Sequence, residues 1–148
     1  SEHCEFLIAG HAGVQTRSLQ KVASGGELAR ISLAIAVITA KITPVPTLIF
    51  DEVDSGIGGA TAEVVGRLLR QLGSDRQVLC VTHLPQVAAC GHHHWRVEKT
   101  QRDGKTQSNL SVLSPDDRVE EVARMLAGIS ITDSTKSVAR EMLAQPTE

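Results

Sequence analysis

Two short apolar runs, each followed by polar residues, mark the middle of the chain. The first covers 47–50 and is followed by Asp51 and Glu52, and the second covers 78–82 and is followed by His83. Short runs of β-forming residues with almost no polar interruption are typical of strands buried on both faces of a mostly parallel sheet. We therefore expect two such strands here.

An amphipathic helix is predicted between these two strands. Its apolar positions recur at helical spacing and it closes near Gly73; they are Ala62, Val65, Leu69 and Leu72. A strand, helix and strand in this order form a right-handed βαβ unit, which places the ends of neighbouring parallel strands at one edge of the sheet. Asp51, Glu52 and His83 are then expected to share the edge where open α/β sheets usually bind ligands.

A second predicted helix begins with Ser24-Gly25-Gly26-Glu27, with Ser24 as its N-cap, and ends at the prolines of 43–46. It is apolar on nearly every side, which is typical of a helix packed deep within a domain. Upstream, 4–9 is predicted to be a strand and 11–22 a polar connection.

The carboxy-terminal third is predicted to hold a hairpin and two helices. Strands at 95–100 and 106–113 flank Asp103-Gly104, a strong turn signal. A helix with Ser114 as its N-cap follows, and a last one comes after Asp133. Their apolar stripes are Val119, Val122, Ala123 and Leu126, and Val138, Ala139, Met142 and Leu143. We expect one α/β domain over 1–148.

Composition narrows the function only slightly. Fifteen basic and seventeen acidic side chains leave the net charge near zero, so composition argues neither for nor against DNA binding. Three widely spaced cysteines favour free thiols and a cytoplasmic location. The longest apolar stretch, 31–42, is too short to cross a bilayer, so we expect no membrane association and no signal peptide. The chain opens on Ser1, which suggests a piece of a longer protein.

The paired carboxylates at the end of the first strand are the leading candidates for chemistry. Two carboxylates at the edge of a core cost several kcal/mol unless a cation or strong donors compensate them. We expect magnesium with a phosphate ester there. The glycines at the start of the Ser24 helix suit an anion, because exposed amides and the helix dipole attract phosphate. Taken singly, each feature is more often a plain turn, a solvated strand end or a structural histidine.

Taken together, these features resemble the ATP-binding-cassette ATPases, and within them the group with long coiled coils that includes the SMC proteins. Ala23 to Glu27 is similar to the signature motif, Leu48 to Glu52 to the Walker B strand, Val53-Asp54 to the D-loop and His83 to the H-loop. A bacterial DNA-repair branch of the group is closer still, over 21–28, 49–54 and 81–88. The resemblance is strong across 21–91.

The resemblance implies a role for each of these residues. Asp51 would hold Mg²⁺ through water, Glu52 would activate the attacking water, and His83 would contact the γ-phosphate of ATP. The signature residues Ser24, Gly25, Gly26 and Glu27 would reach ATP bound to a different head, and Asp54 would link the two sites of such a dimer. The implied fold is the carboxy-terminal lobe of an ABC/SMC-type P-loop ATPase head, a mostly parallel sheet flanked by helices.

The phosphate-binding loop of such ATPases has no counterpart in the chain. No stretch matches Gly-x-x-x-x-Gly-Lys-Ser/Thr; Gly104-Lys105-Thr106 lies in the predicted hairpin. In the resembled group this Walker A loop belongs to an amino-terminal lobe, beyond a coiled coil. The implied partners are that lobe, a second identical head, and DNA bound by the full-length protein in double-strand-break repair and recombination. We expect the chain alone to be inactive.

Other interpretations stay open at this stage. The chain could be a fragment of the nucleotide-binding domain of an ABC transporter, although the spacing from Ser24 to Asp51 is long for one. It could also be a non-catalytic regulatory module that keeps the fold. Cys90 and His92 to His94 could bind zinc, but a surface loop is the favoured interpretation. Arg67, Arg70 and Arg76 could touch DNA or a partner, but solvated helix charges are favoured.

Overall fold

The computed structural model describes residues 5–9, 13–19, 25–42, 45–51, 54–102, 104–128 and 130–144. The amino-terminal half contains β1 (Leu7–Ile8), β2 (Arg17–Ser18), α1 (Gly25–Ile42), β3 (Thr47–Phe50) and α2 (Gly59–Leu72). It is followed by β4 (Gln77–Cys80), α3 (Pro85–Cys90), β5 (Trp95–Arg102), β6 (Lys105–Val112), α4 (Pro115–Ala127) and α5 (Asp133–Ala144). The class is α/β, as the sequence predicts.

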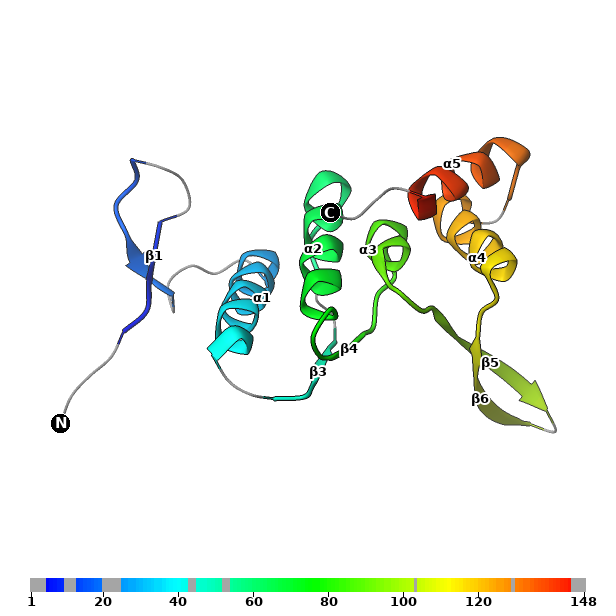
Figure 1. Cartoon of the computed structure of the whole chain (residues 1–148), viewed down its shortest axis with the longest axis horizontal. Coiled ribbons are helices and arrows are strands. Elements are labelled where there is room, and N and C mark those ends of the chain that lie inside the picture. Colours follow the sequence, from blue (N-terminus) through cyan, green and yellow to red (C-terminus); the bar gives the residue numbers. More distant parts are fainter. Residues whose placement is uncertain are drawn as a thin grey trace.

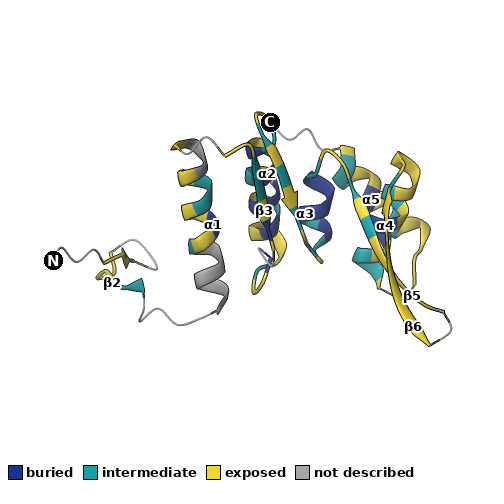
Figure 2. Ribbon diagram, turned by 90° about the horizontal axis from the view of Figure 1, so that it is seen from below, coloured by how far each residue is buried: buried dark blue, intermediate teal, exposed yellow. Residues whose placement is uncertain are grey.

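The described strands form three separate two-stranded sheets. β1 and β2 are antiparallel, β3 and β4 are parallel, and β5 and β6 form an antiparallel hairpin. Figure 1 shows α1, α2 and α3 side by side, with β3 and β4 below them and the β5–β6 hairpin extending below α4. The β1–β2 pair lies beyond α1 in both views (Figures 1 and 2).

The parallel βαβ unit predicted from the sequence is the centre of the fold. β3 and β4 pair in register from Thr47↔Gln77 to Phe50↔Cys80. α2 turns its predicted stripe inward, and Ala62, Val65, Leu69 and Leu72 are all buried. They share a core with Leu33 of α1, Phe50 of β3 and Val87 of α3. Full burial of each large aliphatic side chain contributes about 1.5–3 kcal/mol, so this cluster is the main source of stability for the unit.

Burial is one-sided on β3 and on α1, where the sequence analysis expects complete burial. Phe50 is buried, but Ile49, which points to the opposite face of the strand, is 72% exposed. On α1, Leu33 packs inward while Ile38 and Ile42 lie on the surface. The expectation of deep burial is wrong for this chain, because no described element covers these faces. None of the described helices is long and apolar enough to span a lipid bilayer.

A second, smaller core joins the last two helices. α4 begins as predicted, with Ser114 Oγ accepting a hydrogen bond from the Asp117 amide at 3.2 Å. Val122, Ala123 and Ala139 are fully buried between α4 and α5, with Val119, Leu126, Met142 and Leu143 packed around them. Val138, predicted to lie in the buried stripe, is exposed instead. The predicted β5–β6 hairpin is confirmed, with Trp95 paired to Val112.

Two elements were not predicted. α3 occupies Pro85–Cys90, where the sequence analysis expects only the end of a strand, and β2 lies in the expected polar connection. α3 has six residues, so helical periodicity has no room to appear, and its first residue is a proline, which is favourable there because its missing N–H would be unpaired anyway. Four of its residues besides Pro85 are buried, namely Val87, Ala88, Ala89 and Cys90.

The contact between α2 and α3 has no space for a side chain at Gly66. A Cβ there would lie 2.8 Å from Cys90 Sγ and 3.1 Å from the carbonyl oxygen of Gln86. We predict that Gly66→Ala lowers the free energy of unfolding by about 1–3 kcal/mol, because overpacking against a backbone carbonyl outweighs the gain in helix propensity. Chemical denaturation of the chain would measure the change.

Gly58→Ala is the matched control. Its added Cβ would meet nothing within 4 Å, and its φ of −170° suits any residue. We expect its unfolding midpoint to stay close to that of the unmodified chain. Equal stability of the Gly66→Ala variant and the unmodified chain would show that α2 and α3 are packed more loosely than these distances imply.

Candidate functional site

The candidate site lies at the carboxyl ends of β3 and β4. Asp51 directly follows β3 and is exposed, and the turn that begins at Asp54 comes three residues later. On the neighbouring strand the ladder continues beyond Cys80, since the Val81 amide donates to the Phe50 carbonyl at 2.9 Å. Thr82 and His83 therefore leave the sheet at the same edge as Asp51 and Asp54.

The carboxylate of Asp54 ties the two loops together. Its Oδ2 accepts hydrogen bonds from Thr82 Oγ1 at 2.5 Å and from the His83 backbone amide at 2.8 Å. His83 Nδ1 lies 3.0 Å from the same oxygen. Only 3% of Asp54 is exposed. Three donors on one buried oxygen hold the segment after β4 against the turn after β3.

The charge on Asp54 is stabilised by these donors. Burial acts to raise the pKa of Asp54, but the hydrogen bonds from Thr82 and the His83 amide, with the charge of the His83 ring, outweigh it and lower the pKa. Thr82 Oγ1 also accepts a hydrogen bond from the Leu84 amide at 3.0 Å. The threonine hydroxyl thus joins Asp54 to the residue that caps α3.

His83 is held by one ring nitrogen and open to solvent on the rest of its surface. Its side chain is 74% exposed, while Nδ1 is held by Asp54. A carboxylate on Nδ1 fixes the ring orientation and favours a proton on that nitrogen. Nε2 is then the atom with which His83 can approach a ligand at this edge.

The pKa of the Cys80 thiol reflects the negative charge at this edge of the sheet. Burial, followed by the negative charges of Asp54 and Asp51, raises the pKa of Cys80 to about 11. The thiol is therefore protonated at neutral pH and a poor nucleophile. The two carboxylates make this edge of the sheet favourable for a cation.

Several residues predicted for the site lie outside the described residues or in a part of α1 whose side chains are not described. Ser24 and Glu52 lie outside the described residues, and Gly25, Gly26 and Glu27 form the start of α1. Of the remaining predicted residues, the structure brings Asp54 and His83 into contact and places Asp51 at the same edge. Thr82 was not predicted as a site residue. The one feature of the sequence that could have indicated Thr82 is its hydroxyl group, which lies directly before His83 at the end of a strand.

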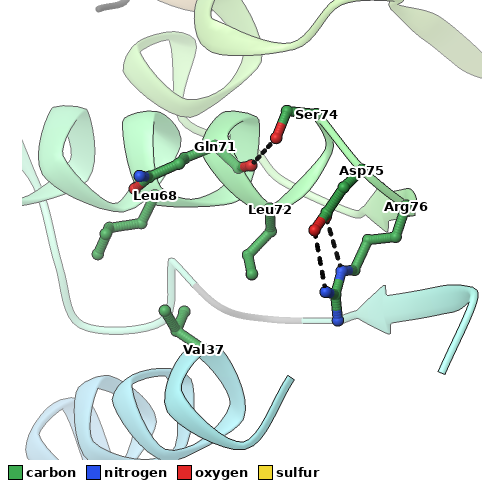
Figure 3. Close-up of a pocket in the computed structure, with 7 residues that line it drawn as sticks. All are labelled: Val37, Leu68, Gln71, Leu72, Ser74, Asp75 and Arg76. Carbon is green, nitrogen blue, oxygen red and sulfur yellow. Dashed lines mark hydrogen bonds and ion pairs between the residues drawn. The ribbon is translucent and has the colours of Figure 1, made fainter. Parts of the chain in front are cut away.

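The described residues at this edge do not form a ready-made metal centre. No group of three or more histidine, cysteine or carboxylate side chains gathers there or elsewhere in the described part of the chain. A cavity of about 280 Å³ lies at the other end of α2 (Figure 3). Its lining comprises Val37, Leu68, Gln71, Leu72, Ser74, Asp75 and Arg76. The cavity is thus close to the amino end of β4 and contains no predicted site residue.

The fold is that of a lobe of an SMC-type head domain. A solved Smc head domain with a coiled coil and joint from Pyrococcus yayanosii superposes with a TM-score of 0.60 at 23% identity, covering 73% of this chain and 20% of that one. A chain solved in work on ATP-driven dimerization and DNA-stimulated activation of SMC ATPases also gives 0.60 at 23% identity, covering 78% of this chain and 68% of that one.

Within this class, the sequence is similar to one segment of the proteins named DNA repair protein RecN. It is 54% identical over 145 residues to DNA repair protein RecN of Xylella fastidiosa and 55% identical over 138 residues to that of Vibrio cholerae. RecN of Bacillus subtilis is 44% identical over 141 residues. These matches cover 98%, 93% and 95% of the chain.

The chain spans about a quarter of the length of these relatives, since the matches cover 26%, 25% and 24% of them. No protein-family model matches the chain. The chain thus corresponds to one segment of a RecN protein. The resemblance to a DNA-repair branch of the SMC-like ATPases, inferred from the motifs, is confirmed.

The buried carboxylate predicts a pH dependence of stability. Because the pKa of Asp54 is lowered in the folded chain, its stabilisation is fully present above its unfolded value of 3.8 and is lost as the pH falls through the lower folded value. We predict that Asp54→Asn costs about 1–3 kcal/mol at neutral pH, because donors from Thr82 and His83 lose a charged acceptor. The cost should shrink on acidification below about pH 4, which denaturant titrations at several pH values would measure.

Asp75→Asn is the control for this experiment. Asp75 also has a lowered pKa, first because of its hydrogen bond with Arg76, but it lies on the surface. Solvent screens such a pair, so we expect a much smaller change. A pH-independent cost for Asp54→Asn would contradict the assignment of a stabilising charge.

Proposed function

We propose that this chain supplies one half of the ATPase site in an SMC-like head. The other half is the amino-terminal Walker A lobe of the same polypeptide, and ATP is hydrolysed where two such heads meet. The observation that carries this proposal is the fixed arrangement of Asp54, Thr82 and His83 beside Asp51 at the ends of two parallel strands. Ligands of open α/β sheets bind at this edge.

The donor set fits Mg²⁺ and the terminal phosphate of ATP. Asp51 is an exposed carboxylate, and Mg²⁺ is commonly held by one or two carboxylates together with water and phosphate oxygens. His83 presents Nε2 with its ring orientation set by Asp54, which suits a contact with the γ-phosphate. Bound Mg-ATP would supply the phosphoanhydride bond to be cleaved. Glu52, next to Asp51, would orient and deprotonate the attacking water.

The signature residues act on the nucleotide of the partner head in this proposal. Gly25 and Gly26 begin α1, where backbone amides point along the helix axis and favour an anion. Ser24 and Glu27 would complete that contact. Asp54, proposed to link the two sites, is engaged within its own chain by Thr82 and His83, so it would transmit the link through the position of its loop.

The bare apolar faces support a head completed by a further lobe. Ile49, Leu79 and Val81 line the outer face of β3 and β4, and Ile49 and Val81 are 72% and 63% exposed. Parallel sheets are normally covered on both faces, and no described element of this chain covers this one, which favours a covering layer from elsewhere. Ile35, Ile38 and Ile42 form a similar exposed stripe on α1. A covering segment of the same polypeptide is consistent with relatives about four times as long.

The biological role follows from the relatives. They are DNA repair proteins, so we propose that the completed protein acts on DNA in double-strand-break repair and recombination, in the cytoplasm and at the nucleoid. Residues 1–148 would act as one unit in it, the carboxy-terminal half of the head. DNA would be bound by the whole protein.

The proposal is tested by changing Glu52→Gln in a full-length RecN protein that contains this segment. We expect hydrolysis of ATP to fall by about 100-fold or more, because the attacking water loses its base, while ATP-stabilised head dimers accumulate. Turnover measurements and size-exclusion chromatography with ATP would detect both effects. The isolated chain is the control and should not bind ATP appreciably. Unchanged turnover would remove Glu52 from its role, and tight binding of ATP by the isolated chain would contradict the half-site.

The covering lobe is tested at the outer face of the parallel sheet. We predict that Ile49→Lys leaves the chain folded, because the side chain is exposed, but weakens its association with a separately produced amino-terminal lobe by about tenfold or more. Titration of one half with the other would measure this affinity. Val138→Lys, at an exposed position on α5, is the matched control and should bind normally. Equal affinities for both variants would show that the lobe does not cover this face.

A further inference from the structure

Helix α3 follows His83 directly, and arginines from two other helices hold its carboxyl end. Arg118 of α4 donates from Nη2 to the carbonyls of Ala88 at 3.2 Å, Ala89 at 3.0 Å and Gly91, and from Nη1 to that of His92 at 3.4 Å. Arg70 of α2 donates to the carbonyl of Cys90 at 2.9 Å. Five successive carbonyls therefore end on two guanidinium groups.

A helix of this length needs such support. The last four carbonyls of any helix have no partner within it, and α3 has only six residues. At its start Leu84 provides no side-chain cap, and at its end Gly91 adopts an extended conformation with ψ of 147°. A cation at the carboxyl end is favoured by the helix dipole, and the planar fork of arginine reaches several carbonyls at once.

Burying the charge of Arg118 costs free energy, which its hydrogen bonds to the carbonyls must compensate. Burial lowers the pKa of Arg118, and the nearby charge of Arg70 lowers it further. The carbonyl oxygens offset this cost. Arg118 extends from the α4–α5 pair, whose own core is separate from that of the βαβ unit. It is thus a polar connection between the two cores through α3.

The other end of α3 is joined to the candidate site. The Leu84 amide donates to Thr82 Oγ1, and the same hydroxyl donates to Asp54. α3 spans about 9 Å, so a shift at its carboxyl end would reach Thr82 and His83 through the hydrogen bonds of Leu84 and Thr82. Leu84 and Val87 pack into the central core, and Cys90 packs against Gly66 of α2, so apolar contacts hold one side of the helix while Arg118 and Arg70 hold its carboxyl end.

We propose that Arg118 is a positioning residue for the ATPase reaction. By holding the carboxyl end of α3, it sets the axial position of the helix and keeps Thr82 and His83 on Asp54 with Nε2 of His83 facing the ligand edge. The inference rests on the proposed function of His83. It gives the α4–α5 pair, which contributes no predicted site residue, a part in the chemistry.

The test uses a full-length RecN protein that contains this segment, with Arg118→Ala and Arg118→Lys. We expect Arg118→Ala to lower kcat by about 10- to 100-fold with little change in KM for ATP, because a displaced His83 affects the reaction more than nucleotide binding. Arg118→Lys keeps the charge but reaches fewer carbonyls and should recover part of the loss. Arg124→Ala is the matched control; Arg124 lies on the same helix and pairs with Glu121, so kcat should not change.

Two further measurements separate positioning from a general loss of stability. Combining Arg118→Ala with Thr82→Val should lower kcat no further than the stronger single change, because both act on the same contact with Asp54. Hydrogen exchange at the His83 and Leu84 amides should be faster by about tenfold in Arg118→Ala and unchanged in Arg124→Ala. This second readout needs no ATPase activity.

The outcomes are distinct. An unchanged kcat in a folded Arg118 variant, additive losses in the double variant, or unaltered exchange at His83 and Leu84 would each overturn the positioning role. If the unmodified protein does not hydrolyse ATP, the proposed function fails, while the exchange data still decide whether Arg118 fixes the loop. If Arg118→Ala does not fold, the kcat and exchange of Arg118→Lys decide in the same way.

Discussion

The acceptance of three donors by Asp54 is the interaction on which the arrangement of this site depends. The described residues 54–58 and 81–84 belong to no helix or strand, so side-chain contacts fix these two segments against each other. A buried carboxylate is tolerated only when its lone pairs are satisfied, and Thr82 and His83 satisfy them. The need to pair one charge therefore orders both loops, orients the imidazole and determines where α3 begins.

The β3–β4 sheet is packed on one face and exposed to solvent on the other. α2 buries a full stripe against Leu33, Phe50 and Val87, and α4 and α5 bury a smaller one. On the opposite face of β3 and β4, Ile49, Leu79 and Val81 are exposed; Figure 2 shows these strands in the colours of exposed and intermediate residues. The exposed apolar face is consistent with the match of this chain to only part of its much longer relatives. The chain, which spans about a quarter of the RecN proteins that it matches, has two cores and one exposed apolar sheet face.

Sequence patterns predicted most of the architecture because much of it is local. The spacing of apolar residues in α2, the proline-rich end of α1 and the Ser114 cap each act within a few residues, and each is found as expected. α3 was missed because six residues cannot show a period. The exposure of Ile49 was missed because the sequence of an apolar strand does not indicate whether the layer that covers its second face belongs to the same chain or to another segment. The Asp54 and Thr82 contact joins residues 28 apart, and only the parallel register brings them together.

The in-register pairing of β3 with β4 limits where the length of the chain can vary. A slip of β4 by one residue would turn Cys80 to the outer face and carry Thr82 about 3.3 Å along the strand from Asp54. The core and the site would be lost in the same step. An insertion or deletion between Cys80 and His83 would break the contacts of Thr82 and His83 with Asp54, whereas the turn at Ser74 and Asp75 lies at the other edge of the sheet.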